Sequence, residues 1–125
     1  MDLKDFIPTE DNLVVELKIK DKPLLNKDGS PMTITVMSPH SKEYKAVIYK
    51  ASNERLKNKD FGIEDLEKFE LNALVDTTVD WNITWDDKKL KEFDPKLAYE
   101  IYSKASWIIL LIKEARADTS DFTIP

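Results

Sequence analysis

The sequence lacks most of the residues on which enzymatic and metal-binding chemistry depends. Its 125 residues include no cysteine, one histidine and two glycines. Without cysteine there are no disulfides and no thiolate zinc sites, and two glycines are too few for Gly-rich phosphate-binding loops. A Ser-His-Asp arrangement would have to use His40, whose place in the stretch SPHS favours an exposed residue in the first turn of a helix. We therefore expect no catalytic, cofactor-binding or metal-binding residues, and predict that the protein is not an enzyme.

Carboxylates after the second tryptophan are the best remaining candidates for a calcium site or a paired-carboxylate hydrolase. They are Asp86, Asp87, Glu92 and Asp94. Their spacing matches no calcium-binding loop, and the glycine that such a loop needs is missing. Three lysines within the same stretch neutralise them. A solvated turn is the favoured interpretation.

Basic clusters and long apolar runs are also scarce. The formal net charge is −5, the pI is about 4.9, and arginine occurs only at Arg55 and Arg116. Nucleic-acid binding needs clustered cations. The longest apolar run, WIILLI at Trp107–Ile112, is far shorter than the roughly 20 residues of a membrane-spanning helix, and the start, MDLKDFIPTED, lacks the apolar core of a secretory signal. We expect a cytoplasmic protein that binds neither nucleic acid nor membrane.

Length and composition predict a single domain over residues 1–125. Residues 1–12 form a polar leader in which Phe6-Ile7-Pro8 is a candidate docking point. Alternating apolar residues on both sides of the turn-forming Asn26–Ser30, where Gly29 can take a positive φ, predict a β-hairpin over residues 13–37. An isolated hairpin is marginal in water, so we expect other elements to pack on it.

The remainder, residues 38–118, is expected to be the helical part. Ser38 as N-cap and Pro39 at the first helical position predict a helix that runs to about Lys57, with an inward face of Tyr44, Val47, Ile48 and Ala51. A second helix should begin near Ile63.

Asp94-Pro95 predicts the start of a third helix, and the apolar period slips around Ser103–Ser106, which indicates a kink or a break into two helices. Between the second and third helices, Val79–Phe93 is interpreted as irregular. A short tail over residues 119–125 carries Phe122, another candidate docking residue. The expected fold is α+β and mostly helical, with the N-terminal β-hairpin packed on a bundle of three to four helices.

Two tryptophans lie four residues apart in VDWNITWDDKK. Each could be buried in the core or exposed on the surface. Trp81 follows Val79 in one apolar pattern, so we expect a core anchor, with both rings on one side of a helical turn. Trp85 precedes Asp-Asp-Lys-Lys, and a core position and a partner contact remain equally open. The last helix carries more apolar residues than one buried face needs. The candidate partner-binding residues are Trp85, Ile108, Leu110 and Leu111.

The order of these features resembles the tail assembly chaperones of siphophages. The segments that carry the resemblance are SPHSKEYK (38–45), VDWNI (79–83), FDPKLAYEIY (93–102) and WIILLIKEARADTSDF (107–122). With the hairpin, the resemblance covers most of the chain from about Leu13 onward.

The resemblance implies a non-enzymatic protein of the infected host's cytoplasm that is absent from the mature virion. Its partners would be the tape measure protein, which it keeps soluble, and the tail tube protein, which it helps to recruit; self-association is a further option. The alternative is a structural tail-completion or connector protein that stays in the virion.

Overall fold

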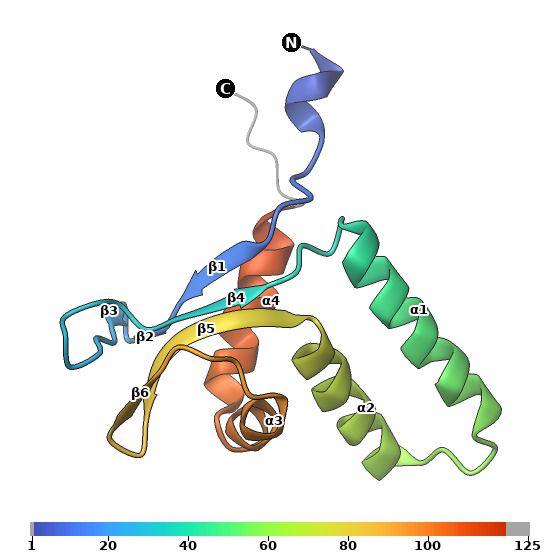
Figure 1. Cartoon of the computed structure of the whole chain (residues 1–125). Coiled ribbons are helices and arrows are strands. Elements are labelled where there is room, and N and C mark those ends of the chain that lie inside the picture. The colour runs from blue at the N-terminus through green and yellow to red at the C-terminus, as the bar shows by residue number, and fades with distance from the viewer. Residues whose placement is uncertain (1, 120–125) are drawn as a thin grey trace.

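The computed structural model describes residues 2–119, and within them the fold is α+β with helices predominating. A four-stranded sheet in the order β1-β4-β5-β6 is combined with four α-helices and a separate two-stranded ribbon. Figure 1 shows the sheet beside a hairpin of the helices α1 and α2, with α3 and α4 on one face of the sheet. The predicted fold class is confirmed, including the N-terminal β-hairpin.

The N-terminal hairpin pairs β1 (Leu13–Glu16) with β4 (Thr33–Val36) in antiparallel register. Gly29 takes the expected positive φ of 85° in the turn at Asn26–Ser30. The connection also contains a small ribbon of β2 (Lys18–Ile19) and β3 (Lys22–Pro23), which the sequence did not predict.

The segment expected to be irregular is a second hairpin, so that interpretation was wrong. It consists of β5 (Thr78–Trp85) and β6 (Lys88–Leu90), and β5 pairs with β4 at the centre of the sheet. The turn between them, Asp86-Asp87, takes φ values of 50° and 67°. Aspartate tolerates this left-handed region better than most residues, so the tight turn forms without glycine.

Helix α1 (Lys42–Lys57) begins four residues later than the proposed N-cap. Ser41 is the N-cap and accepts a hydrogen bond from the backbone N–H of Tyr44, at 3.1 Å. Ser38 instead shapes the preceding turn, because its carbonyl accepts bonds from the backbone N–H and the hydroxyl of Ser41. Helix α2 (Ile63–Asp76) begins where the sequence predicted.

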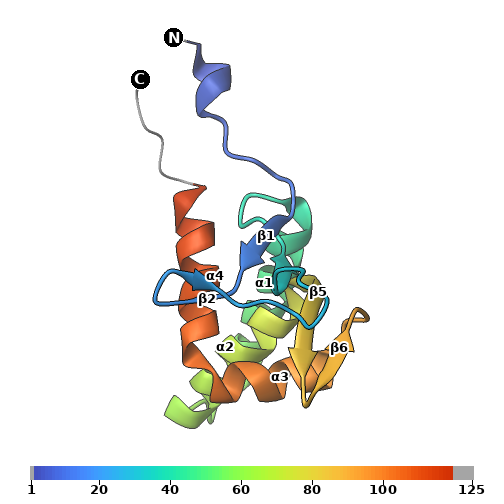
Figure 2. The ribbon, with the colours of Figure 1, turned by 90° about the vertical axis from the view of Figure 1, so that its left-hand side faces the viewer.

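The break in the C-terminal helical region is confirmed. Helix α3 (Pro95–Lys104) is capped by Asp94, and α4 (Ser106–Asp118) follows after the single non-helical residue Ala105. Figure 2 shows α3 running across the lower end of α4, where α4 begins. No helix in residues 2–119 is both long and apolar enough to cross a bilayer.

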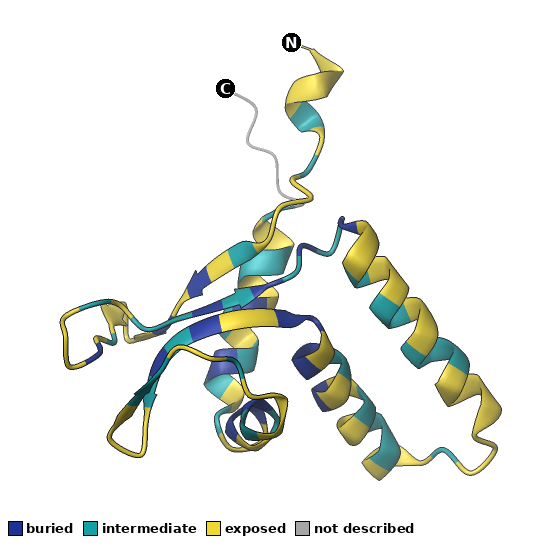
Figure 3. Ribbon diagram, in the orientation of Figure 1, coloured by how far each residue is buried: buried dark blue, intermediate teal, exposed yellow. Residues whose placement is uncertain are grey.

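The core lies between the sheet and the helices α2, α3 and α4, whereas α1 contributes no buried residue. Figure 3 shows this difference, with the buried positions gathered on the sheet and its adjacent helices. The buried apolar side chains are Val15, Leu17, Ile34, Val36, Leu71, Leu74, Val75, Trp81, Ile83, Ala98, Ile101, Tyr102, Ile108 and Ile112.

Candidate functional site

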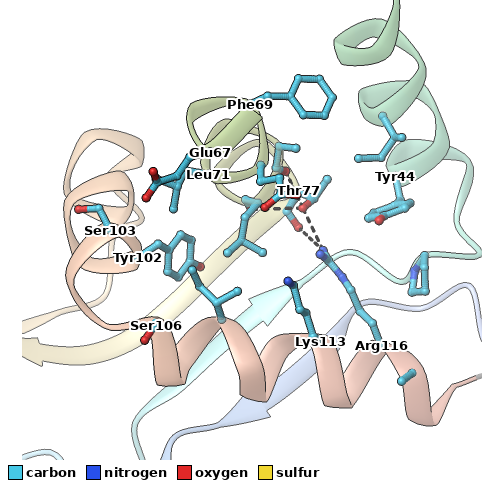
Figure 4. Close-up of a pocket in the computed structure, with 17 residues that line it drawn as sticks. Tyr44, Glu67, Phe69, Leu71, Thr77, Tyr102, Ser103, Ser106, Lys113 and Arg116 are labelled. Atoms are coloured by element: carbon cyan, nitrogen blue, oxygen red, sulfur yellow. Dashed lines mark hydrogen bonds between the residues drawn. The ribbon is translucent and has the colours of Figure 1, made fainter. Parts of the chain in front are cut away.

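An open groove lies between α1 and α4, with residues of α2 and α3 completing its lining, and we call it the α1–α4 groove. It has a volume of about 740 Å³. Figure 4 shows Tyr44 on α1 and Phe69 on α2 across the space from Lys113 and Arg116 on α4. Its walls are mainly helical and apolar, with Ile48, Leu71 and Leu74 among the lining residues. These dimensions and this character suit a ligand-binding cleft.

The groove is open because α1 packs mainly on α2 and contacts α4 through the Tyr44 ring over Arg116. The predicted inward face of α1, namely Tyr44, Val47, Ile48 and Ala51, is only half-buried. Two further apolar side chains of α1, Tyr49 and Leu56, are 71% and 81% exposed. The predicted face is the less exposed side of α1, but it contributes no residue to the buried core. An amphipathic helix that buries so little is normally stabilised by a further surface.

Arg116 connects α4 to the strands at the end of the groove. Its Nε donates a hydrogen bond to the carbonyl of Met37 at 3.2 Å, and its Nη2 donates to Thr77 Oγ1 at 3.0 Å and to the Thr77 carbonyl at 3.4 Å. Thr77 is the C-cap of α2, so the guanidinium lies where the helix dipole favours a cation. The Tyr44 ring also covers it, with a distance of 4.9 Å from Arg116 Cζ to the ring centroid.

Two cations, Lys113 and Arg116, and two carboxylates, Glu67 and Glu70, line the groove. Within residues 2–119, no carboxylate oxygen lies within 4.0 Å of the charged nitrogens of Arg116 or Lys113. Burial lowers the pKa of Arg116 from its ordinary value, and the neighbouring tyrosines Tyr44 and Tyr102 oppose that shift. The groove therefore combines apolar walls with two cations and two carboxylates, so its lining has no excess of either charge.

Tyr102 forms part of the groove floor and is fixed by a buried hydrogen bond. Its hydroxyl lies 2.8 Å from Thr78 Oγ1, and Thr78 Oγ1 donates its own proton to the Leu74 carbonyl at 2.8 Å. Since a threonine hydroxyl has one proton, Tyr102 is the donor to Thr78. Burial raises the pKa of Tyr102, and the bond to Thr78 opposes that rise. The floor at Tyr102 is buried and hydrogen-bonded, whereas α1 has no buried residue.

The predicted partner-binding residues of α4 differ in how far they are buried. Ile108 is 5% exposed and lies in the core, because α4 turns this side chain toward the sheet, so naming it as a surface contact was wrong. Leu111 is half-buried against the core. Leu110 is 59% exposed and stands one helical turn from the groove residues Ser106 and Lys113.

The two tryptophans lie on the same face of β5, as residues four apart on a strand do. Trp81 is 3% exposed, donates from Nε1 to the Glu92 carbonyl at 2.9 Å, and packs edge-to-face on Phe93. Its predicted role as a core anchor is confirmed, on a strand instead of a helical turn. Trp85, near the end of the strand, is 36% exposed.

The other candidates from the sequence have structural roles. Asp86 and Asp87 form the β5–β6 turn, Asp87 pairs with Lys27 at 2.7 Å, and Asp94 caps α3. Within residues 2–119, no group of three or more His, Asp or Glu side chains is arranged to hold a metal ion. His40 lies in the turn before α1. Phe122 lies outside the described residues.

Sequence reasoning missed the groove because its walls come from segments far apart in the chain. The one available signal was the scarcity of arginine, since Arg116 is one of only two arginines and lies four residues after the last apolar run. No family model, curated protein or solved structure matches the chain.

Proposed function

We propose that this protein is a bacteriophage tail assembly chaperone that binds the tape measure protein and keeps it soluble while tail tube subunits are recruited. The observation that carries the proposal is the α1–α4 groove, an open apolar cleft with helical walls. The groove is a candidate binding site, and it supports the proposal together with the sequence motifs that resemble this family.

The groove suits an amphipathic helix, which can lay its apolar face between α1 and α4. A long helical protein with exposed apolar stripes aggregates until those stripes are covered. Since none of its residues is buried, α1 can shift to fit different stretches of the client at low cost. Leu110 at the groove edge extends the apolar surface, and Trp85 offers a further contact on the sheet.

The protein's net charge supports its proposed role in keeping the tape measure protein soluble. A net charge of −5 keeps a complex soluble through repulsion between particles. The proposed activity is binding alone, without catalysis, in the cytoplasm of the infected host. Release would follow when tube subunits cover the same stripes, which leaves the chaperone out of the mature virion.

The first test is co-expression with the tape measure protein of the same genome, followed by affinity capture and a solubility assay. We expect the tape measure protein to become soluble and to co-purify. Ile48→Asp, which places a charge in the groove wall, should reduce capture at least about tenfold, which corresponds to 1.4 kcal/mol. Leu56→Asp is the matched control, because Leu56 lies on the same helix, is 81% exposed and does not line the groove.

Circular dichroism must show that both variants remain folded. Equal capture by the two variants would remove the groove from the proposal. A tape measure protein that stays insoluble and unbound, together with detection of this chain in purified virions by mass spectrometry, would replace the chaperone with a structural tail component.

A further inference from the structure

The side of α1 that faces away from the α1–α4 groove is exposed, apolar at its centre and basic around it. Residues three or four positions apart share one side of a helix. On this side, Tyr49 is 71% exposed and Leu56 is 81% exposed. None of its residues lines the groove. We call this surface the outer face of α1, and it consists of Lys42, Lys45, Ala46, Tyr49, Lys50, Asn53, Leu56 and Lys57.

The outer face is positively charged in a protein whose net charge is negative. Helix α1 contains five basic and two acidic residues, whereas the whole chain has a formal net charge of −5. The two acidic residues, Glu43 and Glu54, are about three turns apart, so they form one row along the edge of the outer face and not within it. Within residues 2–119, none of the four lysines has a carboxylate oxygen within 4.0 Å. An acidic ligand can therefore pair with them.

The segment before β1 has the opposite charge and is also exposed and apolar. Residues 2–11, which we call the N-terminal arm, contain one turn of 3₁₀-helix, Leu3–Phe6. Leu3 is 84% exposed and Ile7 is 69% exposed. Against the single basic residue Lys4, the arm has four acidic residues, namely Asp2, Asp5, Glu10 and Asp11. The arm and the outer face of α1 are therefore complementary, because both expose large apolar side chains and their charges are opposite.

The arm does not cover the outer face of α1 in its own chain. Its base is held at Thr9, whose carbonyl accepts a 2.6 Å hydrogen bond from the buried hydroxyl of Ser38. Ser38 lies four positions before the first residue of α1. From this point, Figures 1 and 2 show the arm extending away from α1, the sheet and the other helices. Since the arm and α1 diverge here, the outer face is open to the arm of another molecule.

The acidic surface of α2 matches the outer face less well than the arm does. Helix α2 carries Glu64, Glu67 and Glu70, but its one large exposed apolar side chain is Ile63. Glu67 and Glu70 also line the groove together with two cations. The arm combines its acidic residues with two exposed apolar side chains on one short segment, so it is the better ligand for a face that is both apolar and basic.

We propose that the N-terminal arm of one copy binds the outer face of α1 on a second copy. The carboxylates of the arm pair with the lysines, and Leu3 and Ile7 contact Tyr49 and Leu56. The contact is heterologous, since arm meets helix and not arm meets arm, so it builds head-to-tail assemblies. The groove lies on the opposite side of α1 and stays open to a client. The inference therefore goes beyond the proposed function and does not rest on it.

Analytical ultracentrifugation of the full chain over a concentration series tests this assembly. We expect the average mass of the wild type to rise with concentration. Asp5→Lys with Glu10→Lys reverses the charge of the arm, and Lys45→Glu with Lys50→Glu reverses that of the outer face. Each of these two variants should raise the dissociation constant at least about tenfold. All four side chains are exposed, so both variants should keep the fold, which circular dichroism checks.

Matched controls separate this contact from general effects of net charge and surface polarity. Lys91→Glu with Lys96→Glu makes the same charge reversal at two exposed lysines outside α1 and should associate like the wild type. Leu3→Ser with Ile7→Ser should weaken association at least about tenfold, whereas Ile63→Ser, at a position on α2 that is 88% exposed, should not. An equal loss in a control and in its matched variant would overturn the proposal.

Mixing the two charge-reversed variants gives the decisive result. The basic arm of the first then meets the acidic outer face of the second, and the acidic arm of the second meets the basic outer face of the first. The mixture should therefore associate, although each variant alone does so weakly.

Three outcomes would contradict the proposal. They are a wild type that stays monomeric throughout the series, a mixture that forms no complex, and association that the outer-face variant loses but the arm variant keeps. The last would mean that a different acidic surface of the second copy covers α1. Because only this chain is used, none of these outcomes depends on the tape measure experiment.

Discussion

Replacing Arg116 with methionine removes the connection between α4 and the ends of the two central strands. The substitution keeps most of the aliphatic volume but deletes the guanidinium that reaches Met37 and Thr77. It also removes the cation that lies under the Tyr44 ring. We expect the free energy of unfolding to fall by about 2 kcal/mol.

That magnitude is the balance of opposing effects. Each hydrogen bond from a charged group contributes roughly 1.5–3 kcal/mol, and Arg116 makes three. Two effects reduce the loss. Burial lowers the pKa of Arg116, which shows that the cation itself pays a desolvation cost. Water in the open groove can also bond the Met37 carbonyl once the side chain is gone. The loss of the hydrogen bonds therefore outweighs the two compensating effects, and the net result is a partial loss of stability.

Urea unfolding followed by circular dichroism measures the effect, with Arg55→Met as the control. Arg55 is the other arginine of the chain, and it lies exposed over Phe61 at 4.7 Å from the ring centroid. An exposed cation–π contact contributes about 0.5–1 kcal/mol. Arg55 also lies 5.7 Å from the Phe69 ring centroid, so the control should lose about 1 kcal/mol. If Arg116→Met changed stability by less than about 0.5 kcal/mol, Arg116 would not hold the strand ends to α4.

Two further predictions concern single hydrogen bonds. Tyr102→Phe removes the proton donated to Thr78 and should cost about 1 kcal/mol in urea unfolding; an unchanged midpoint would show that this bond does not form in solution. The salt bridge and hydrogen bond from Lys89, with further bonds from Ser30, hold the pKa of Asp28 well below its ordinary value. Since the pKa is lowered in the folded state, the stabilising effect is present at neutral pH and disappears as the pH falls through the folded-state pKa. Asp28→Asn should therefore destabilise the protein at pH 7, and its difference from the wild type should shrink as the pH falls below the ordinary pKa of an aspartate; an Asp28 carboxyl that titrates at its ordinary value by NMR would contradict this.

Local patterns predicted the fold wherever a segment's structure depends on its own residues. The Asp94-Pro95 start of α3, the break before α4 and the first β-hairpin were all predicted correctly. The β5–β6 hairpin was missed because its turn uses two aspartates at positive φ. Both Ser38 and Ser41 can cap a helix, and the choice of Ser41 depended on Ser38 bonding to Thr9, 29 residues earlier in the chain.

The candidate site was much less predictable than the fold. Trp81 was correctly placed in the core, but Ile108, which is 5% exposed, was named as a partner contact because the run of six apolar residues, WIILLI, has more apolar side chains than one buried face needs. The groove required knowing that α1 stands apart from α4, and no local pattern contains that information.

By itself, the sequence determined the helical segments and the first β-hairpin, and that the chain has no cysteine and a single histidine. Capping, turn chemistry and apolar periodicity act over a few residues, so they can be seen in a single sequence. Only the tertiary structure decided that Arg116 meets Met37, 79 positions away, and that α1 leaves an open groove. Such contacts depend on how the sheet and the helices pack as whole elements, and that packing is set by the shape of the complete core.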